Sequence, residues 1–136
     1  MIYIKDNKGI TLVEVMAAVL LFLLGIAALL GVITQSVQSA KKAGLAYKAH
    51  NLAKSRLETL RSVSFGDLSY GSELSTAINE QGVKDENGSF IRNTTVTTSY
   101  TGDGALTYVK VSVNYIYKGQ QSPSPMEAST VIFSGG

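Results

Sequence analysis

Hydrophobic side chains fill one long block near the start of the chain, at residues 10–33. Within this block only Glu14 is charged, and residues 15–33 carry no charge at all. As a helix, these 24 residues would rise about 36 Å, which exceeds the roughly 30 Å of a bilayer hydrocarbon core. Backbone polar groups in lipid must be satisfied within the segment itself. The pattern therefore predicts a transmembrane helix over residues 10–33, preceded by a short polar segment at residues 1–9.

Beyond residue 33, apolar residues recur at steps of three and four. This spacing predicts that the same helix continues over residues 34–64 as an amphipathic half. The predicted apolar stripe consists of Leu45, Ala49, Leu52, Ala53, Leu57, Leu60 and Val63. Because such a stripe needs a covering surface, we expect a sheet or a bundle to follow it.

The rest of the chain, residues 65–136, changes from a glycine-broken segment to a strand pattern. Residues 65–88 predict a loop, with a short helix at residues 72–80. From residue 89 the hydrophobic period becomes two, which predicts three antiparallel strands, at residues 90–100, 106–117 and 126–133. A turn at residues 101–104 and a polar loop at residues 119–125 separate them. The middle strand should place Val109, Val111, Val113, Tyr115 and Tyr117 on one face, and Lys110, Ser112 and Asn114 on the other.

These elements predict an α+β fold in which the second half of a long N-terminal helix packs on a small antiparallel sheet. The expected parts are residues 1–9, the transmembrane half at 10–33, the amphipathic half at 34–64, and a head of loop plus three-stranded sheet at 65–136.

Composition and charge remove several functional classes. The chain has 136 residues, a net charge of +2 and no cysteine. So small a charge offers no broad basic face, and we predict no nucleic-acid partner. Without cysteine there is no disulfide scaffold, thiolate metal site or cysteine nucleophile. No nucleophile–base set, phosphate-binding loop or pair of carboxylates is present, so we expect no enzymatic activity and no cofactor.

Glu14 is the unusual residue of the hydrophobic block. A carboxylate within a membrane-spanning helix costs about 3 kcal/mol on insertion scales, and it is a functional candidate by default. If the chain were cut between Gly9 and Ile10, Glu14 would be the fifth residue of a new N-terminus, about one helical turn from a free amine. The alternatives are a glutamate that snorkels to the headgroups, a simple signal anchor, and a cleaved secretory signal. The last has an apolar region of only about 7–15 residues, which is shorter than this block.

Residues 8–15, Lys-Gly-Ile-Thr-Leu-Val-Glu-Val, resemble the class III signal of type IV prepilins and type II secretion pseudopilins. The resemblance implies that a membrane prepilin peptidase removes a leader, residues 1–9, by cutting between Gly9 and Ile10, and that Ile10 is then N-methylated. It also implies that Glu14 pairs with the N-terminal amine of a neighbouring subunit during assembly. One departure is that Gly31 stands where many major pilins have a helix-bending proline. It is compatible with local melting during assembly or with close helix packing.

Residues 49–58 contain Ala-x-x-Leu-Ala-x-x-x-Leu-Glu, which is similar to minor pilins of the PilV type and pseudopilins of the GspI type. The resemblance implies a pilin-like fold and a minor subunit of a type IV pilus, with a type II secretion pseudopilin as the alternative. A non-polymerising, single-pass, membrane-anchored binding module is a third possibility. The implied partners are the prepilin peptidase/N-methyltransferase, other pilin or pseudopilin subunits, the inner-membrane assembly platform and, before assembly, the lipid bilayer. The implied location is the cytoplasmic (inner) membrane with the N-terminus in the cytoplasm, and then an extracellular or periplasmic filament.

Three further groups could carry chemistry, and each has a plainer interpretation. His50 is the sole histidine and has no neighbouring ligand type for a metal. Residues 85–88, Asp-Glu-Asn-Gly, resemble part of a calcium loop but lack its remaining acidic ligands, so a turn is favoured. Tyr108, Tyr115 and Tyr117 could form an exposed aromatic patch, although packing along a strand is the commoner role. We therefore predict no metal site.

Overall fold

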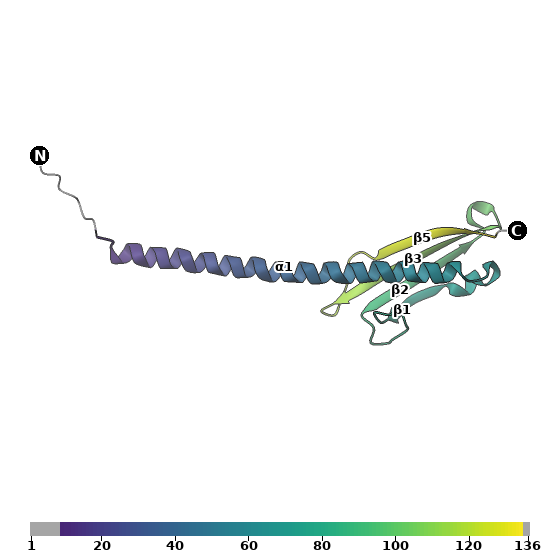
Figure 1. Cartoon of the computed structure of the whole chain (residues 1–136), viewed down its shortest axis with the longest axis horizontal. Helices are drawn as coiled ribbons and strands as arrows, with labels where there is room; N and C mark the ends of the chain where they lie inside the picture. Colours follow the sequence, from purple (N-terminus) through teal and green to yellow (C-terminus); the bar gives the residue numbers. More distant parts are fainter. Residues whose placement is uncertain (1–8, 135–136) are drawn as a thin grey trace, which may run out of the picture. The chain divides into compact units, whose positions relative to one another are not determined.

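The computed structural model describes residues 9–134 and shows one long helix, two short 3₁₀ helices and five strands (Figure 1). The chain divides into two compact units, residues 1–40 and 41–136. The leader other than Gly9 lies outside the described residues. In chain order the elements are α1 (Leu12–Arg61), η1 (Phe65–Gly71), β1 (Glu73–Ile78), β2 (Phe90–Thr98), η2 (Tyr100–Gly102), β3 (Leu106–Tyr117), β4 (Gln120–Gln121) and β5 (Met126–Phe133).

The expectation of one continuous helix is confirmed. Helix α1 spans 50 residues, from Leu12 to Arg61. Its part in the first unit has no buried residue in the apolar stretch, whereas its part in the second unit buries one face. The fold is accordingly α+β and pilin-like, with a long N-terminal apolar helix and a curled antiparallel sheet.

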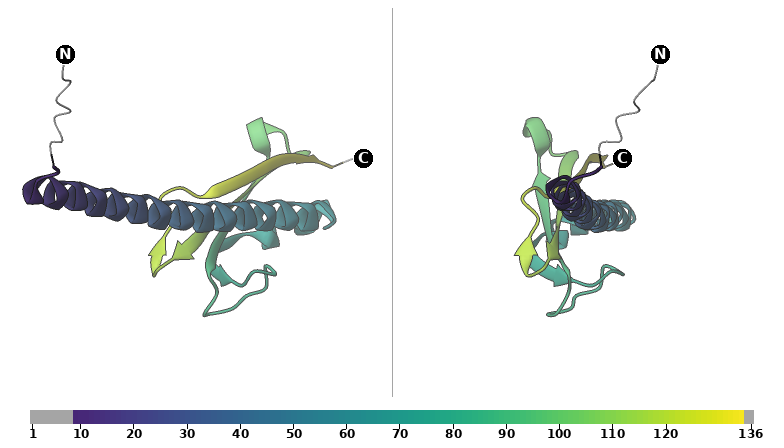
Figure 2. Two further views of the ribbon diagram at one scale, coloured as in Figure 1. Left: turned by 60° about the vertical axis from the view of Figure 1, so that its left-hand side comes forward. Right: turned by 90° about the vertical axis from the view of Figure 1, so that its left-hand side faces the viewer.

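In the second unit α1 runs along one face of the sheet in both views of Figure 2, and the buried core is built from residues of α1, the sheet and η1. Helix α1 contributes the predicted stripe residues Ala49, Leu52, Ala53, Leu57 and Leu60. Val63 is an exception, because α1 ends at Arg61 and Val63 is 37% exposed. The sheet and η1 contribute Leu68, Ile78, Phe90, Val109, Val111 and Val113.

Strand β3 is the centre of the sheet. It pairs antiparallel with β2 along one side and with β5 and β4 along the other, while β1 pairs with the free side of β2. The predicted strands at residues 106–117 and 126–133 coincide with β3 and β5, and β2 ends two residues before the predicted limit. The period of two thus located the three longest strands of the described chain.

The sheet has five strands rather than the predicted three. The helix predicted at residues 72–80 is wrong, because residues 73–78 form β1. An isolated helix of that length is unstable in water, whereas an edge strand gains ladder hydrogen bonds from β2. The segment at 119–125, predicted as a loop, contains β4, which forms a hairpin with the end of β3. Its turn residues, Lys118 and Gly119, have φ of 52° and 76°, as a two-residue type I′ turn requires.

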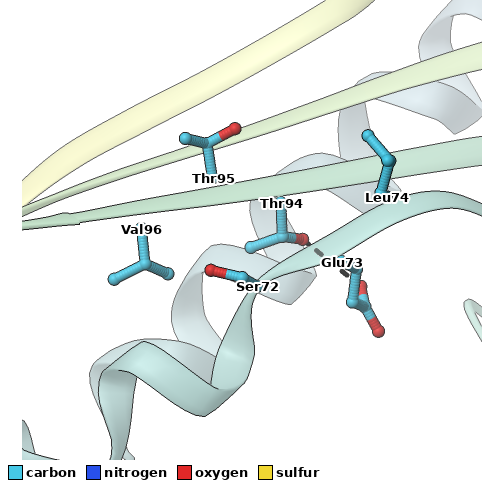
Figure 3. A pocket seen from close by; sticks show the side chains of 6 residues that line it. All are labelled: Ser72, Glu73, Leu74, Thr94, Thr95 and Val96. Carbon is cyan, nitrogen blue, oxygen red and sulfur yellow. Dashed lines mark hydrogen bonds between the residues drawn. The ribbon is translucent and has the colours of Figure 1, made fainter.

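Strand β1 contains a bulge that turns an apolar side chain outward. The register shifts between Glu73, opposite Thr94, and Thr76, opposite Arg92. Ser75 adopts a φ of 47° and its N–H donates to Asn93 Oδ1 at 2.7 Å. Leu74 consequently remains 87% exposed beside an open depression between β1 and β2 (Figure 3).

A buried ion cluster joins α1, β1 and β2. Arg92 donates from Nε to Glu73 Oε2 at 2.7 Å and from Nη2 to Glu73 Oε1 at 3.1 Å. Arg56 Nη2, from α1, lies 3.4 Å from Glu73 Oε1. Thr94 donates its hydroxyl to Glu73 Oε2, which Figure 3 shows as a dashed line. Burial by itself would raise the pKa of Glu73, but the Arg92 hydrogen bonds and the charges of Arg92 and Arg56 outweigh it and lower the pKa below its usual 4.5. Glu73 is therefore an anion that fixes the helix to the edge strand.

Asn114 of β3 is buried, although the alternation of the strand predicted that it would lie on the exposed face. The alternation places it with Lys110 and Ser112 on the outer face, yet it is only 8% exposed. Its amide donates to the carbonyl and to the hydroxyl oxygen of Ser122, both at 3.1 Å. The chain that follows β4 thus covers this end of β3, and Asn114 supplies the polar partner that the buried carbonyl of Ser122 needs.

Candidate processing and assembly site

The start of α1 is built by a local cap. Gly9, Ile10 and Thr11 precede the helix, which begins at Leu12. Thr11 Oγ1 accepts a hydrogen bond from the Glu14 N–H at 3.3 Å, and the Thr11 carbonyl accepts one from the Val15 N–H at 3.2 Å. A threonine three residues before a glutamate is the capping-box pattern, which fixes where a helix begins.

Thr11 belongs to the motif at residues 8–15, but its role as the helix cap was not predicted. The signal was present, because Thr-x-x-Glu directly before an apolar run marks a helix start. In the uncut chain Ile10 lies just outside the helix, which begins at Leu12. The expected distance of about one helical turn between a new amine at Ile10 and Glu14 applies to the cut chain and stays a prediction.

The peptide bond between Gly9 and Ile10 lies in this non-helical, exposed segment. Ile10 is 75% exposed, and a Cβ built on Gly9 would meet no atom within 4 Å. A protease binds its substrate as an extended chain, and an accessible segment next to a helix start meets that requirement. Gly9 and Ile10, between which the sequence predicts cleavage, are thus both accessible and both precede the capping residue Thr11.

Glu14 is exposed in the first turn of α1. Its backbone N–H is bound by Thr11, and the partial positive charge of a helix N-terminus favours a carboxylate at this position. Within residues 9–134, Glu14 forms no ion pair.

The apolar part of α1 presents bare hydrophobic surface around its whole circumference. Leu12 is 77% exposed, Phe22 68% and Leu29 64%, and the other large apolar residues from 13 to 33 are exposed as well. A soluble protein rarely exposes such a surface, so lipid or other helices must cover it. The helix continues without a break through Gly25 and Gly31. A Cβ at either position would have no atom within 4 Å, so both glycines lie on open surface.

The other candidates from the sequence do not join this site. His50 is half-buried on α1, and the described residues contain no cluster of three potential metal ligands. Asp85 closes a turn, because its Oδ1 accepts the Asn87 N–H at 3.0 Å and its carbonyl accepts the Gly88 N–H at 2.9 Å. Among the tyrosines, Tyr108 stacks on Tyr100 at 5.1 Å between ring centroids, and Tyr115 packs against the core.

Residues 4–30 match the family model described as the prokaryotic N-terminal methylation motif. Comparison of the chain with curated proteins and with solved structures finds no match. The motif supports a type IV prepilin-like family and indicates a protein of the type IV pilin or pseudopilin type. It implies processing by a prepilin peptidase and assembly with other pilin subunits, and with the apolar helix it indicates a single-pass anchor in the inner membrane. Structural subunits of this kind are generally not enzymes.

Proposed function

We propose that this chain is a structural subunit of a type IV pilus, in the role of a minor pilin. In this proposal the peptidase removes residues 1–9, Ile10 becomes the methylated N-terminus, and the apolar half of α1 passes from the membrane into a filament core. The observation that carries the proposal is the wholly exposed apolar helix, which begins at a capped turn holding Glu14 directly after an accessible Gly9–Ile10 bond.

The chemistry of assembly follows from charge and packing. Cleavage creates an amine at Ile10, and both this cation and the Glu14 carboxylate are costly in lipid. When subunits stack, the amine of one and the Glu14 of its neighbour become a single pair, which reduces that cost. Lipid tails are as apolar as the helix, so burial by itself supplies little free energy, and helix packing together with this pair drives assembly.

A type II secretion pseudopilin is the second candidate, since it would use the same start of α1 in the same way. The small head without a disulfide favours a minor subunit in either system. Deletion of the chain separates the two, because a pilin's loss removes or alters pili, whereas a pseudopilin's loss retains a secreted substrate inside the cell.

The first experiment is N-terminal mass spectrometry of the chain recovered from membranes and from sheared filaments. We expect a mature protein that begins at Ile10 and carries one added methyl group. Gly9→Val should remain uncut, and Gly25→Val is the matched control because its Cβ also points into open space. A chain that retains its initiator methionine in every fraction would instead support the non-polymerising anchored module.

The second experiment separates cutting from assembly. Glu14→Ala should leave cleavage largely intact and reduce methylation or filament incorporation, because the amine of the next subunit then has no anion to meet. Glu86→Ala, an exposed acid in the head, is the control and should behave as wild type. Normal incorporation of the Glu14→Ala chain would refute the pairing role.

A further inference from the structure

Three lysines and a tyrosine gather where α1 enters the second unit. The Nζ atoms of Lys42 and Lys118 lie 5.8 and 5.5 Å from the ring centroid of Tyr117, close enough for both to interact with the ring. Lys41 and Tyr117 line a shallow depression whose other lining residues are Gly44, Leu45 and Lys48. We call Lys41, Lys42, Tyr117 and Lys118 the lysine–tyrosine patch.

The charge of this patch is not balanced from within the described chain. Lys48, at its edge, is neutralised by Glu80 at 2.7 Å, and on the sheet Lys110 is neutralised by Glu127 at 2.8 Å. Within residues 9–134, no acidic group lies within ion-pair distance of Lys41, Lys42 or Lys118. Two cations, Lys42 and Lys118, therefore lie beside one half-buried aromatic ring, and a third, Lys41, lines the depression next to it. All three lysines are exposed.

The backbone conformation of Lys118 shows that placing a lysine at this position of the turn costs free energy. Lys118 occupies the first central position of the β3–β4 turn with a φ of 52°, where asparagine or glycine is the favoured residue. A lysine in the left-handed region strains the turn. The turn carries that strain while holding an ammonium group over Tyr117.

The position of the patch in the sequence determines its environment. Lys41 and Lys42 are the first charged residues after the apolar stretch, and Lys41 follows Ile33 by eight residues of α1, or about 12 Å of helical rise. A lysine side chain can extend back along the helix toward the headgroup layer. Lysine and tyrosine together are also the residues that anchor proteins at the membrane–water interface.

We propose that the lysine–tyrosine patch binds the headgroups of anionic phospholipids while the chain is still anchored in the membrane. This inference rests on the proposed membrane-anchored state of the subunit. The depression is lined mainly by apolar atoms, which suits the glycerol region of a lipid better than a nucleic-acid backbone. Charge complementarity and the tether to the bilayer both favour a lipid, because a tethered patch meets headgroups at high effective concentration. The patch would hold the head against the bilayer and release it when the subunit enters a filament.

The test uses the full chain in nanodiscs of phosphatidylcholine, with or without one third phosphatidylglycerol. An amine-reactive acetylating reagent modifies the lysines, and peptide mass spectrometry gives the rate at each position. One lysine near an anionic membrane surface raises the binding affinity about fivefold. We therefore expect the acetylation rates at Lys41, Lys42 and Lys118 to fall at least about fivefold when phosphatidylglycerol is present. Lys84, exposed and distant in sequence, should change little, and about 1 M salt should abolish the difference because screening then acts within about 3 Å.

Two variants exclude a folding artefact. Lys118→Asn removes a cation and places a favoured residue in the turn, so the hairpin should be retained while protection of Lys41 and Lys42 weakens about fivefold. Lys84→Asn removes the same charge elsewhere and should leave protection unchanged. Equal protection of all lysines, or no protection, would overturn the proposal. Stronger protection by inorganic phosphate or a DNA oligonucleotide in pure phosphatidylcholine would also overturn it. The result is independent of processing, because loss of lipid binding leaves cleavage after Gly9 and methylation of Ile10 unaffected.

Discussion

The side chain that most clearly holds the head together is Glu73, and Glu73→Gln removes its charge with almost no change in shape. The substitution leaves β1, β2 and α1 in place but withdraws the anion from Arg92 and Arg56. Arg92 would keep its bond from Nη1 to the Gly82 carbonyl at 3.1 Å, and Arg56 its bond to the Gly71 carbonyl at 3.2 Å. Neither carbonyl can replace a carboxylate.

The expected magnitude follows from burial. The side chains of Arg92 and Glu73 are 7% and 11% exposed, and that of Arg56 is 22% exposed. Breaking a buried pair by removing one partner costs about 3–5 kcal/mol, because the other charge stays buried and uncompensated. The cost should lie at the lower end of this range, because glutamine still offers a carbonyl oxygen to the arginines and Arg56 remains partly exposed to solvent. We therefore expect a loss of about 3 kcal/mol in the free energy of unfolding of the head.

The assay is urea unfolding of the full chain in mild detergent, followed by the fluorescence of its seven tyrosines. With a slope near 2 kcal/mol per molar urea, the expected loss moves the midpoint down by about 1.5 M. Glu86→Gln is the matched control, since Glu86 is exposed and forms no ion pair within residues 9–134. If the two variants unfold together, the cluster does not stabilise the head and the reasoning fails.

Acidification supplies an independent check. Because the folded state lowers the pKa of Glu73 below 4.5, its contribution to stability is fully present above the pKa of the unfolded chain. That contribution is lost as the pH falls from about 4.5 through the lower folded value. The difference in unfolding free energy between wild type and Glu73→Gln should thus be constant near neutrality and shrink in acid. A difference that does not depend on pH would show that the carboxylate charge is not its source.

Three further substitutions test other parts of the fold. Gly88→Ala would place a Cβ against the backbone carbonyl of Ile78, so it should lower the unfolding free energy by about 3 kcal/mol. Gly104→Ala, in open space, should be neutral in the same urea assay. Asn114→Ala leaves the buried carbonyl of Ser122 without its donor and should cost about 2 kcal/mol by thermal denaturation; no cost would mean that water replaces the amide. Thr11→Val removes the cap and should raise amide exchange at the first turn of α1 about fivefold, an effect that Thr11→Ser should not show.

Features that depend on a local pattern of residues could be predicted before the fold was known. The apolar run and the three- and four-residue spacing predicted one continuous helix, and α1 spans nearly all of it. The period of two located β3 and β5 at their observed limits. The residues predicted for processing, Gly9 and Ile10, and for assembly, Glu14, are consecutive or nearly so, which is why a motif could single them out. Their roles stay a prediction until the mature N-terminus is measured.

Features that depend on contacts between distant segments became visible in the folded chain alone. Strand β1 exists because β2 offers an open edge, and no local signal in residues 73–78 announced it. Asn114 is buried because the chain after β4 folds over it, which the alternation of β3 could not reveal. The cluster of Arg56, Glu73 and Arg92 joins residues 17 and 19 positions apart. A hydrophobic period indicates which face of a helix or strand is apolar. A strand edge, a buried amide or an ion pair is instead stabilised by a partner on another segment, and the period of one segment contains no information about that partner.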